Sequence, residues 1–166
     1  MMEIIDRLES ALEILSSVSG GCRLQPAGRS ACPAGIDMRK EAKELISRYS
    51  ELPLIQQLVI RAKLVKGMPD QLDESCRAIV AALEDDFDRA GKPRWLHLFR
   101  FGRDGLCYWI RHWACGEGSS RQASELFGMS QGSHYRFWKE VVEFQLNSFV
   151  ANAADKLVVD ECAAGS

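Results

Sequence analysis

The sequence lacks any run of about 18 apolar residues, the length that a membrane-spanning helix needs. It also lacks the opening pattern of a secretory signal, because its first residues, MMEIIDRLES, carry acidic side chains before any apolar stretch. Membrane insertion and export both depend on such segments. The two absences therefore predict a cytoplasmic protein that does not bind a membrane.

The cysteines and histidines lack the spacing of a metal site. None of the six cysteines forms a CxxC pair, and Cys76, Cys107 and Cys115 fall in helical patterns where cysteine is usually a small buried residue. Cys22 and Cys32 bracket a loop, but a zinc site needs four ligands and the three histidines lie far away in sequence. We expect no disulfide framework, no metal and no cofactor.

A catalytic constellation is also missing. No Ser-His-Asp, metal-ligand or paired-carboxylate pattern rises above chance. The lone histidines, His97, His112 and His134, are expected at helix surfaces or against aromatic neighbours rather than in proton transfer. The sequence thus predicts a protein that is not an enzyme.

The composition is that of a soluble globular protein, with 46% apolar and 27% charged residues among 166. Apolar residues recur at helical spacing, which predicts an all-α protein: a helical bundle with a C-terminal trihelical helix-turn-helix unit. The expected parts are an amphipathic helix (1–18), a flexible loop (19–36), a helical body (37–91), a helix-turn-helix region (92–150) and a frayed tail (151–166).

The helical body is expected to start with a helical hairpin. Asp37 can cap a helix that runs to Ser50, and Pro53 can open a second helix that closes at Gly67. Further on, Leu106 to Trp113 follows the spacing of a helix with a heavy aromatic face, which is the natural first helix of the trihelical unit.

Charge is unevenly distributed along the chain. The net formal charge is −2, but residues 89–139 hold nine Lys and Arg against three acids, which gives +6 there and −8 in the remainder. Because phosphate attraction depends on the local field rather than on the total charge, this asymmetry favours a DNA-binding region on an acidic body.

The segment 119–149 predicts two helices joined by a tight turn. Ser119 can cap a short helix, with Gln122 three residues later in a reciprocal arrangement. Gly128 can take a positive φ, and Ser130 can cap a second helix, so the chain turns within about three residues. That length and chemistry are typical of a helix-turn-helix, although two helices joined by a glycine turn also occur in ordinary helical bundles.

The helix-turn-helix template assigns an inner and an outer face to this segment. Its inner positions hold Ala123, Phe127, Met129 and Phe137, with Ser124 where the helices cross. His134 stands where valine or isoleucine usually packs, so either the imidazole is partly buried or the second helix is rolled. The outer face holds Gln131, Tyr135, Arg136 and Lys139, whose side-chain types suit a major groove: Gln pairs with adenine edges, Arg with guanine edges and Lys with phosphate.

The segment 106–146, LCYWIRHWACGEGSSRQASELFGMSQGSHYRFWKEVVEFQL, resembles the final module of sigma-like helix-turn-helix proteins. It is most similar to the smaller, non-zinc lambdoid phage Q antiterminators, which end in an aromatic helix, a G-x-S link, a short Ala-containing helix, a Leu/Phe-Gly-x-Ser turn and a long last helix. The residues that carry this resemblance are Trp109, Arg111, Gly118, Ser119, Ala123, Phe127, Gly128, Ser130 and Lys139. The resemblance implies a regulator that binds a promoter-adjacent DNA element, engages paused RNA polymerase with its sigma factor and lets it read through terminators.

The leading hypothesis is a sequence-specific DNA-binding transcription regulator of phage type, a monomer or homodimer whose most specific form is an antiterminator. The expected contacts are base or phosphate contacts from Gln131, Arg136 and Lys139, stacking or hydrogen bonding from Tyr135, and backbone contacts from Arg121 and Arg111. Two alternatives remain: a small terminase-like DNA-packaging subunit, which would form a large closed ring, and a helical module whose basic region meets an acidic protein.

Overall fold

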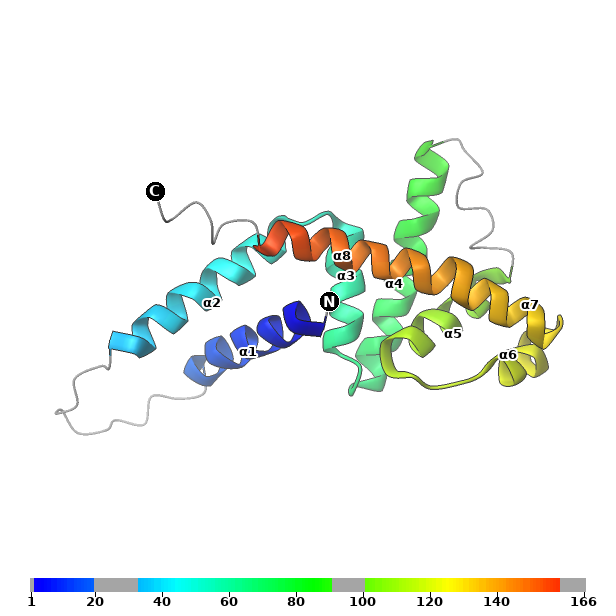
Figure 1. Cartoon of the computed structure of the whole chain (residues 1–166), viewed down its shortest axis with the longest axis horizontal. Helices are drawn as coiled ribbons and strands as arrows, with labels where there is room; N and C mark the ends of the chain where they lie inside the picture. Colours follow the sequence, from blue (N-terminus) through cyan, green and yellow to red (C-terminus); the bar gives the residue numbers. More distant parts are fainter. Residues whose placement is uncertain (1, 20–32, 91–100, 159–166) are drawn as a thin grey trace. The chain divides into compact units, whose positions relative to one another are not determined.

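The computed structural model describes residues 2–19, 33–90 and 101–158 (Figure 1). Helices and short turns make up this described part, which contains no strand, so the prediction of an all-α protein is confirmed. Within the same ranges, no helix is both long and apolar enough to cross a membrane. The chain forms two compact units, Met1–Leu52 together with Ala153–Ser166, and Pro53–Asn152.

The first unit is built on two antiparallel helices, α1 (Met2–Ser19) and α2 (Pro33–Glu51), which pack along one another (Figure 1). Ile4, Leu8 and Ala11 of α1 are buried, whereas Leu12 is 45% exposed. Among the side chains of these two helices whose burial is described, the buried apolar ones are Ile4, Ile5, Leu8, Ala11 and Ala42.

The start of α2 differs from the prediction. The helix begins at Pro33, so Asp37 lies inside the helix instead of capping it, and the last residues of the expected loop are helical. Proline is accommodated in the first helical turn because its missing N–H has no intrahelical partner there. The rest of that loop, residues 20–32 with Cys22 and Cys32, lies outside the described residues.

The two helices of the predicted hairpin fall in different units. α2 packs on α1, whereas α3 (Leu54–Leu64) belongs to the second unit and packs on α4 (Pro69–Ala90). α3 begins at Leu54, one residue after the predicted opening at Pro53, which occupies the N-cap position, and it ends at Leu64 instead of the predicted Gly67. Pairing follows the match of apolar stripes, and the stripe of α4 offers five buried residues to α3 and α5: Leu72, Cys76, Ile79, Val80 and Leu83.

The central helix of the second unit is α5 (Gly102–Cys115), which contacts α3, α4, α6 and η2. It begins four residues before the predicted start at Leu106, and residues 91–100 lie outside the described ranges. The predicted aromatic face is confirmed by four buried residues: Leu106, Trp109, Ile110 and Trp113.

Trp113 connects α5 to helices on either side of it. Its indole N–H donates to the Asn147 side-chain oxygen at 2.9 Å. Lys63 of α3 donates to the Trp113 carbonyl, and its ammonium lies 4.1 Å from the centre of the Trp113 ring. Burial, followed by the like charge of Lys66, lowers the pKa of Lys63, but the carbonyl and the ring face still stabilise its charged form.

The C-terminal helices are α6 (Ser120–Phe127) and a continuous stretch made of α7 (Gln131–Arg136), the π-helical segment η2 (Phe137–Glu143) and α8 (Phe144–Val158). The stretch includes the first eight residues of the predicted frayed tail, 151–158. It continues because Val150, Ala153 and Leu157 extend its buried stripe. Phe144 does not belong to this stripe and is 63% exposed. Residues 159–166 are outside the described part.

Candidate nucleic-acid interface

Tyr108 holds the link between α5 and α6. Its hydroxyl accepts a hydrogen bond from the Ser119 backbone N–H at 2.7 Å and donates one to the Ser119 carbonyl at 2.9 Å. Gly118 has a φ of +96°, and a Cβ there would lie 2.5 Å from the Tyr108 hydroxyl. The positive φ therefore favours glycine at position 118, and any larger residue would also displace the Tyr108 side chain.

The predicted serine caps are confirmed at both helices. The Ser119 hydroxyl accepts from the Gln122 N–H at 3.2 Å, and the Ser130 hydroxyl accepts from the Ser133 N–H at 3.2 Å. One half of the reciprocal arrangement predicted at Ser119 is different, because the Tyr108 hydroxyl, and not the Gln122 side chain, accepts the Ser119 N–H. The caps place α6 and α7 on either side of a three-residue turn.

The turn uses two consecutive residues with positive φ. Gly128 has a φ of +73° and Met129 a φ of +67°, which is uncommon for a residue with a side chain. The Ser124 hydroxyl donates to the Met129 carbonyl at 2.6 Å and so ties α6 to the turn. The prediction that Met129 is an inner residue is wrong: on this left-handed backbone its side chain is 44% exposed.

His134 is fully buried at the position where the template wants an aliphatic residue. Its Nε2 lies 2.8 Å from the Gly128 carbonyl, which can only accept, so Nε2 carries the proton. The imidazole packs 4.7 Å from the Phe101 ring and 6.0 Å from the Trp109 ring, between ring centres. Of the two alternatives drawn from the sequence, burial is the one observed, and α7 keeps the predicted rotation.

The inner face of the C-terminal helices is aromatic. Ala123 and Phe137 are buried as predicted, and Phe127 is half-buried with its ring 5.7 Å from that of Tyr108. Trp138 stacks on Trp109 with 5.5 Å between ring centres and an interplanar angle of 15°. This packing fixes α7 and η2 on α5 and leaves their opposite side free of the core.

Gln131, Tyr135, Arg136 and Lys139 are all exposed on that opposite side, and the Tyr135 side chain is 55% exposed. Three of them lie on α7, and Lys139 follows in η2. The Arg136 Nε donates a long bond of 3.4 Å to the Gly132 carbonyl. Most of the guanidinium's donors therefore remain available for an incoming acceptor.

Acidic neighbours reduce the predicted positive charge of this region. Lys139 pairs with Glu143 at 2.8 Å, and Arg121 pairs with Glu125 at 3.2 Å. In the second pair both side chains are exposed. The hydrogen bond that the Lys139 ammonium donates to the Glu143 carboxylate raises the pKa of Lys139, so this ammonium stays charged. Among the described residues 101–139, Arg136 is the cation with no acidic partner. Exposed pairs contribute only about 0–1 kcal/mol, so phosphates can displace them.

Arg111, expected to contact the DNA backbone, is held by two carboxylates. Its guanidinium bonds Asp73 of α4 at 2.7 Å and Glu117 of the following link at 3.3 Å, and its side chain is 35% exposed. Burial opposes its charge, but the two carboxylates outweigh burial and raise the pKa of Arg111. The structure thus gives Arg111 a role in fastening α5 to α4 and does not join it to the face of α7.

Three residues of this region were not singled out from the sequence. Tyr108 clamps the link, while Glu117 and Glu143 neutralise predicted DNA contacts. Glu143 could have been found from the sequence, since it lies four residues after Lys139 on a helix. Tyr108 lies eleven residues from its partner and gives no local signal.

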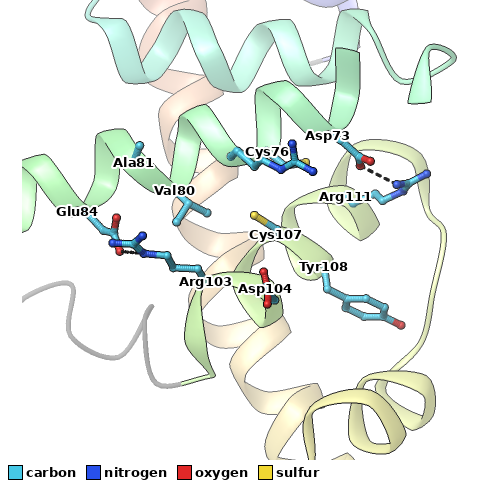
Figure 2. Close-up of a pocket in the computed structure, with 11 residues that line it drawn as sticks. Asp73, Cys76, Val80, Ala81, Glu84, Arg103, Asp104, Cys107, Tyr108 and Arg111 are labelled. Atoms are coloured by element: carbon cyan, nitrogen blue, oxygen red, sulfur yellow. Dashed lines mark hydrogen bonds and ion pairs between the residues drawn. The ribbon is translucent and has the colours of Figure 1, made fainter. Parts of the chain in front are cut away.

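A cavity of about 510 Å³ lies between α4 and α5 (Figure 2). Ion pairs stand at its two ends, Arg103 with Glu84 at 2.6 Å and Arg111 with Asp73, while thiols line its middle. Burial raises the pKa of Cys76 to about 12 and also raises that of Cys107, so both thiols stay protonated near neutral pH and are poor nucleophiles. In the described part of the chain, no three side chains of metal-binding type come together.

Comparisons with known proteins add no family to this picture. No protein-family model, no curated protein and no solved structure matches the chain.

Proposed function

We propose that the chain is a sequence-specific DNA-binding transcription regulator of phage type, in which α6, the turn and α7 act as a helix-turn-helix. In its most specific form it is an antiterminator that acts with RNA polymerase and its sigma factor. The observation that carries the DNA-binding proposal is the exposed polar face of α7 and η2, opposite a fully packed aromatic side.

The exposed face has the side-chain chemistry of base readout. Arg136 is suited to the O6 and N7 acceptors of guanine, and Gln131 to the N6 and N7 atoms of adenine. Lys139 and Arg121 supply phosphate contacts once Glu143 and Glu125 are displaced. Tyr135 can donate to a phosphate or contact a thymine methyl group. An α-helix fits the major groove, which is about 12 Å wide.

Packing supports the rigidity that base readout needs. Because His134, Phe137 and Trp138 are buried on the inner side, α7 cannot roll without exposing them. Both of its ends are also fixed, by the Ser130 cap and by continuation into η2. The antitermination part of the proposal has a different basis, which is the resemblance of residues 106–146 to the phage Q antiterminators.

The test starts by selecting duplexes that the full-length protein enriches from a random pool. Fluorescence anisotropy then compares Arg136→Ala, Lys139→Ala and a control, Arg39→Ala on the exposed side of α2. Arg136→Ala is expected to weaken binding by about 1–3 kcal/mol and to relax selectivity at one base pair. Lys139→Ala should weaken binding to all sequences alike. It should also reduce the slope of log affinity against log salt concentration by about 1. If Arg39→Ala weakens binding as much as the other two, the assigned face is wrong.

A second candidate function is that of a helical protein-interaction module. The observation that favours it is the pair of exposed apolar side chains beside the turn, Leu126 at 67% and Met129 at 44% exposure. Leu126→Glu separates the two functions, because it alters this apolar pair and leaves the polar face of α7 intact. If Leu126→Glu leaves the affinity for the selected duplex unchanged, Leu126 and Met129 serve a role other than DNA contact.

A further inference from the structure

A groove of about 450 Å³ runs between α1 and α2 in the first unit. Its α2 side is formed by Met38, Glu41, Ala42 and Leu45, which recur at i, i+3, i+4 and i+7. Its α1 side follows the same kind of spacing and consists of Glu3, Asp6, Arg7, Ser10, Ala11 and Ile14. The groove therefore follows one face of each helix and spans about three turns, or roughly 16 Å.

The floor of the groove is apolar and made partly of small residues. Ala11 and Ala42 are each 4% exposed where α1 and α2 approach each other. Met38 stands at the edge of this floor with 54% of its surface exposed. A shallow apolar channel between two helices matches the shape of an amphipathic helix laid along it, whose anchors recur at i, i+3 or i+4 and i+7.

The rim of the groove is acidic. Glu3, Asp6 and Glu41 are exposed, and Arg7 is the one basic residue among those that line the groove. A second copy of this chain would bring the same carboxylates against each other, which disfavours self-association through this face. A helix with Lys or Arg beside its apolar stripe would instead place opposite charges along both edges.

We propose that this groove binds a basic amphipathic helix of about three turns from another protein. The apolar stripe of that helix covers Ala11, Ala42 and Met38, and its cations face Asp6 and Glu41. The first unit would then hold a protein partner while the second unit contacts DNA, so this inference stands independently of the α7 interface.

The probe is a capped synthetic helix of about 14 residues with leucines at i, i+3, i+4 and i+7 and lysines beside them. A matched peptide carries glutamate in place of lysine. Full-length protein is titrated by fluorescence anisotropy. We expect saturable, salt-sensitive binding of the lysine peptide in the micromolar range, and at least about tenfold weaker binding of the glutamate peptide.

Four variants locate the binding. Binding of the lysine peptide should be severalfold weaker in each of three variants: Asp6→Lys, Glu41→Lys and Met38→Glu. Glu13→Lys is the control, since this exposed carboxylate lies on α1 outside the residues that line the groove. Circular dichroism is used to check that all four variants stay helical. The affinity for the selected DNA duplex should not fall in any of them.

Several outcomes would overturn the proposal. These are no saturable binding of the lysine peptide, equal binding of both peptides, or an effect of Glu13→Lys as large as that of Glu41→Lys. Self-association of the wild type that Met38→Glu abolishes would make a second copy the occupant. Residues 20–32 can be replaced by a Gly-Ser linker. If the lysine peptide then binds much more tightly, the occupant of the groove is that segment of the chain.

Discussion

Substitution of Gly118 by alanine tests the clamp that sets α6 relative to α5. The added Cβ would lie 2.5 Å from the Tyr108 hydroxyl oxygen and 2.8 Å from the ring carbon that bears it. Tyr108 must then move and release both bonds to Ser119, at a cost of about 0.5–1.5 kcal/mol each. A φ of +96° adds about 1–3 kcal/mol for a residue with a side chain. We expect Gly118→Ala to destabilise the second unit by about 2–6 kcal/mol.

Two other glycines separate the contributions to that cost. Gly116 has a φ of +78° with no described atom within 4 Å of its virtual Cβ, so Gly116→Ala reports the backbone strain alone, about 1–2 kcal/mol. Gly132 has an equally open Cβ position inside α7 and no positive φ, so Gly132→Ala should be neutral or stabilising by about 0.5 kcal/mol. Tyr108→Phe removes the two bonds without adding a Cβ and should cost about 1 kcal/mol, since Ser119 is exposed to water.

Urea unfolding followed by tryptophan fluorescence is the assay for this series. Trp109, Trp113 and Trp138 are buried within the unit Pro53–Asn152, so changes in their emission report that unit. The expected order of destabilisation is Gly118→Ala, then Gly116→Ala, then Gly132→Ala. A Gly118→Ala protein no less stable than Gly116→Ala would refute the role assigned to Tyr108.

Three further predictions concern the core and the charged face. His134→Ala empties a fully buried site and removes the bond to Gly128, so it should lower the free energy of unfolding by about 2–4 kcal/mol in the same urea assay. Because burial raises the pKa of Cys76 from 9.0 to about 12, its contribution to stability is fully present below pH 9 and is lost as the pH rises towards 12. The wild type should therefore lose more stability between pH 8 and about 10.5 than Cys76→Ala does, and equal losses would contradict the raised pKa. Glu143→Gln frees Lys139 from its carboxylate partner and should strengthen duplex binding about two- to fivefold in anisotropy titrations, whereas Glu74→Gln, remote on α4, should leave it unchanged.

The features predicted correctly from the sequence depend on neighbours within one helical turn or two. Ser119 and Ser130 were assigned as caps because a hydroxyl and a backbone N–H three residues apart suffice to define that bond. The aromatic face of α5 and the exposure of Tyr135 and Arg136 follow likewise from helical periodicity.

The features that were missed depend on contacts between distant residues. Tyr108 reaches Ser119 across eleven residues, and Arg111 reaches Asp73 across 38, so spacing along the chain indicates neither. The packing of α2 on α1 was missed for the same reason, and with it the groove between α1 and α2. Met129 was misassigned because the template places its side chain on the inner face. The template does not account for the positive φ at this position, which turns the side chain outward.

The most direct test of the DNA-binding proposal is an NMR titration of the ¹⁵N-labelled full-length protein with its selected duplex. The proposal predicts that the largest amide shift changes fall on Gln131, Tyr135, Arg136 and Lys139, with few in α1 and α2. Changes confined to the first unit, or an unaltered spectrum of α7 at saturating duplex, would contradict it.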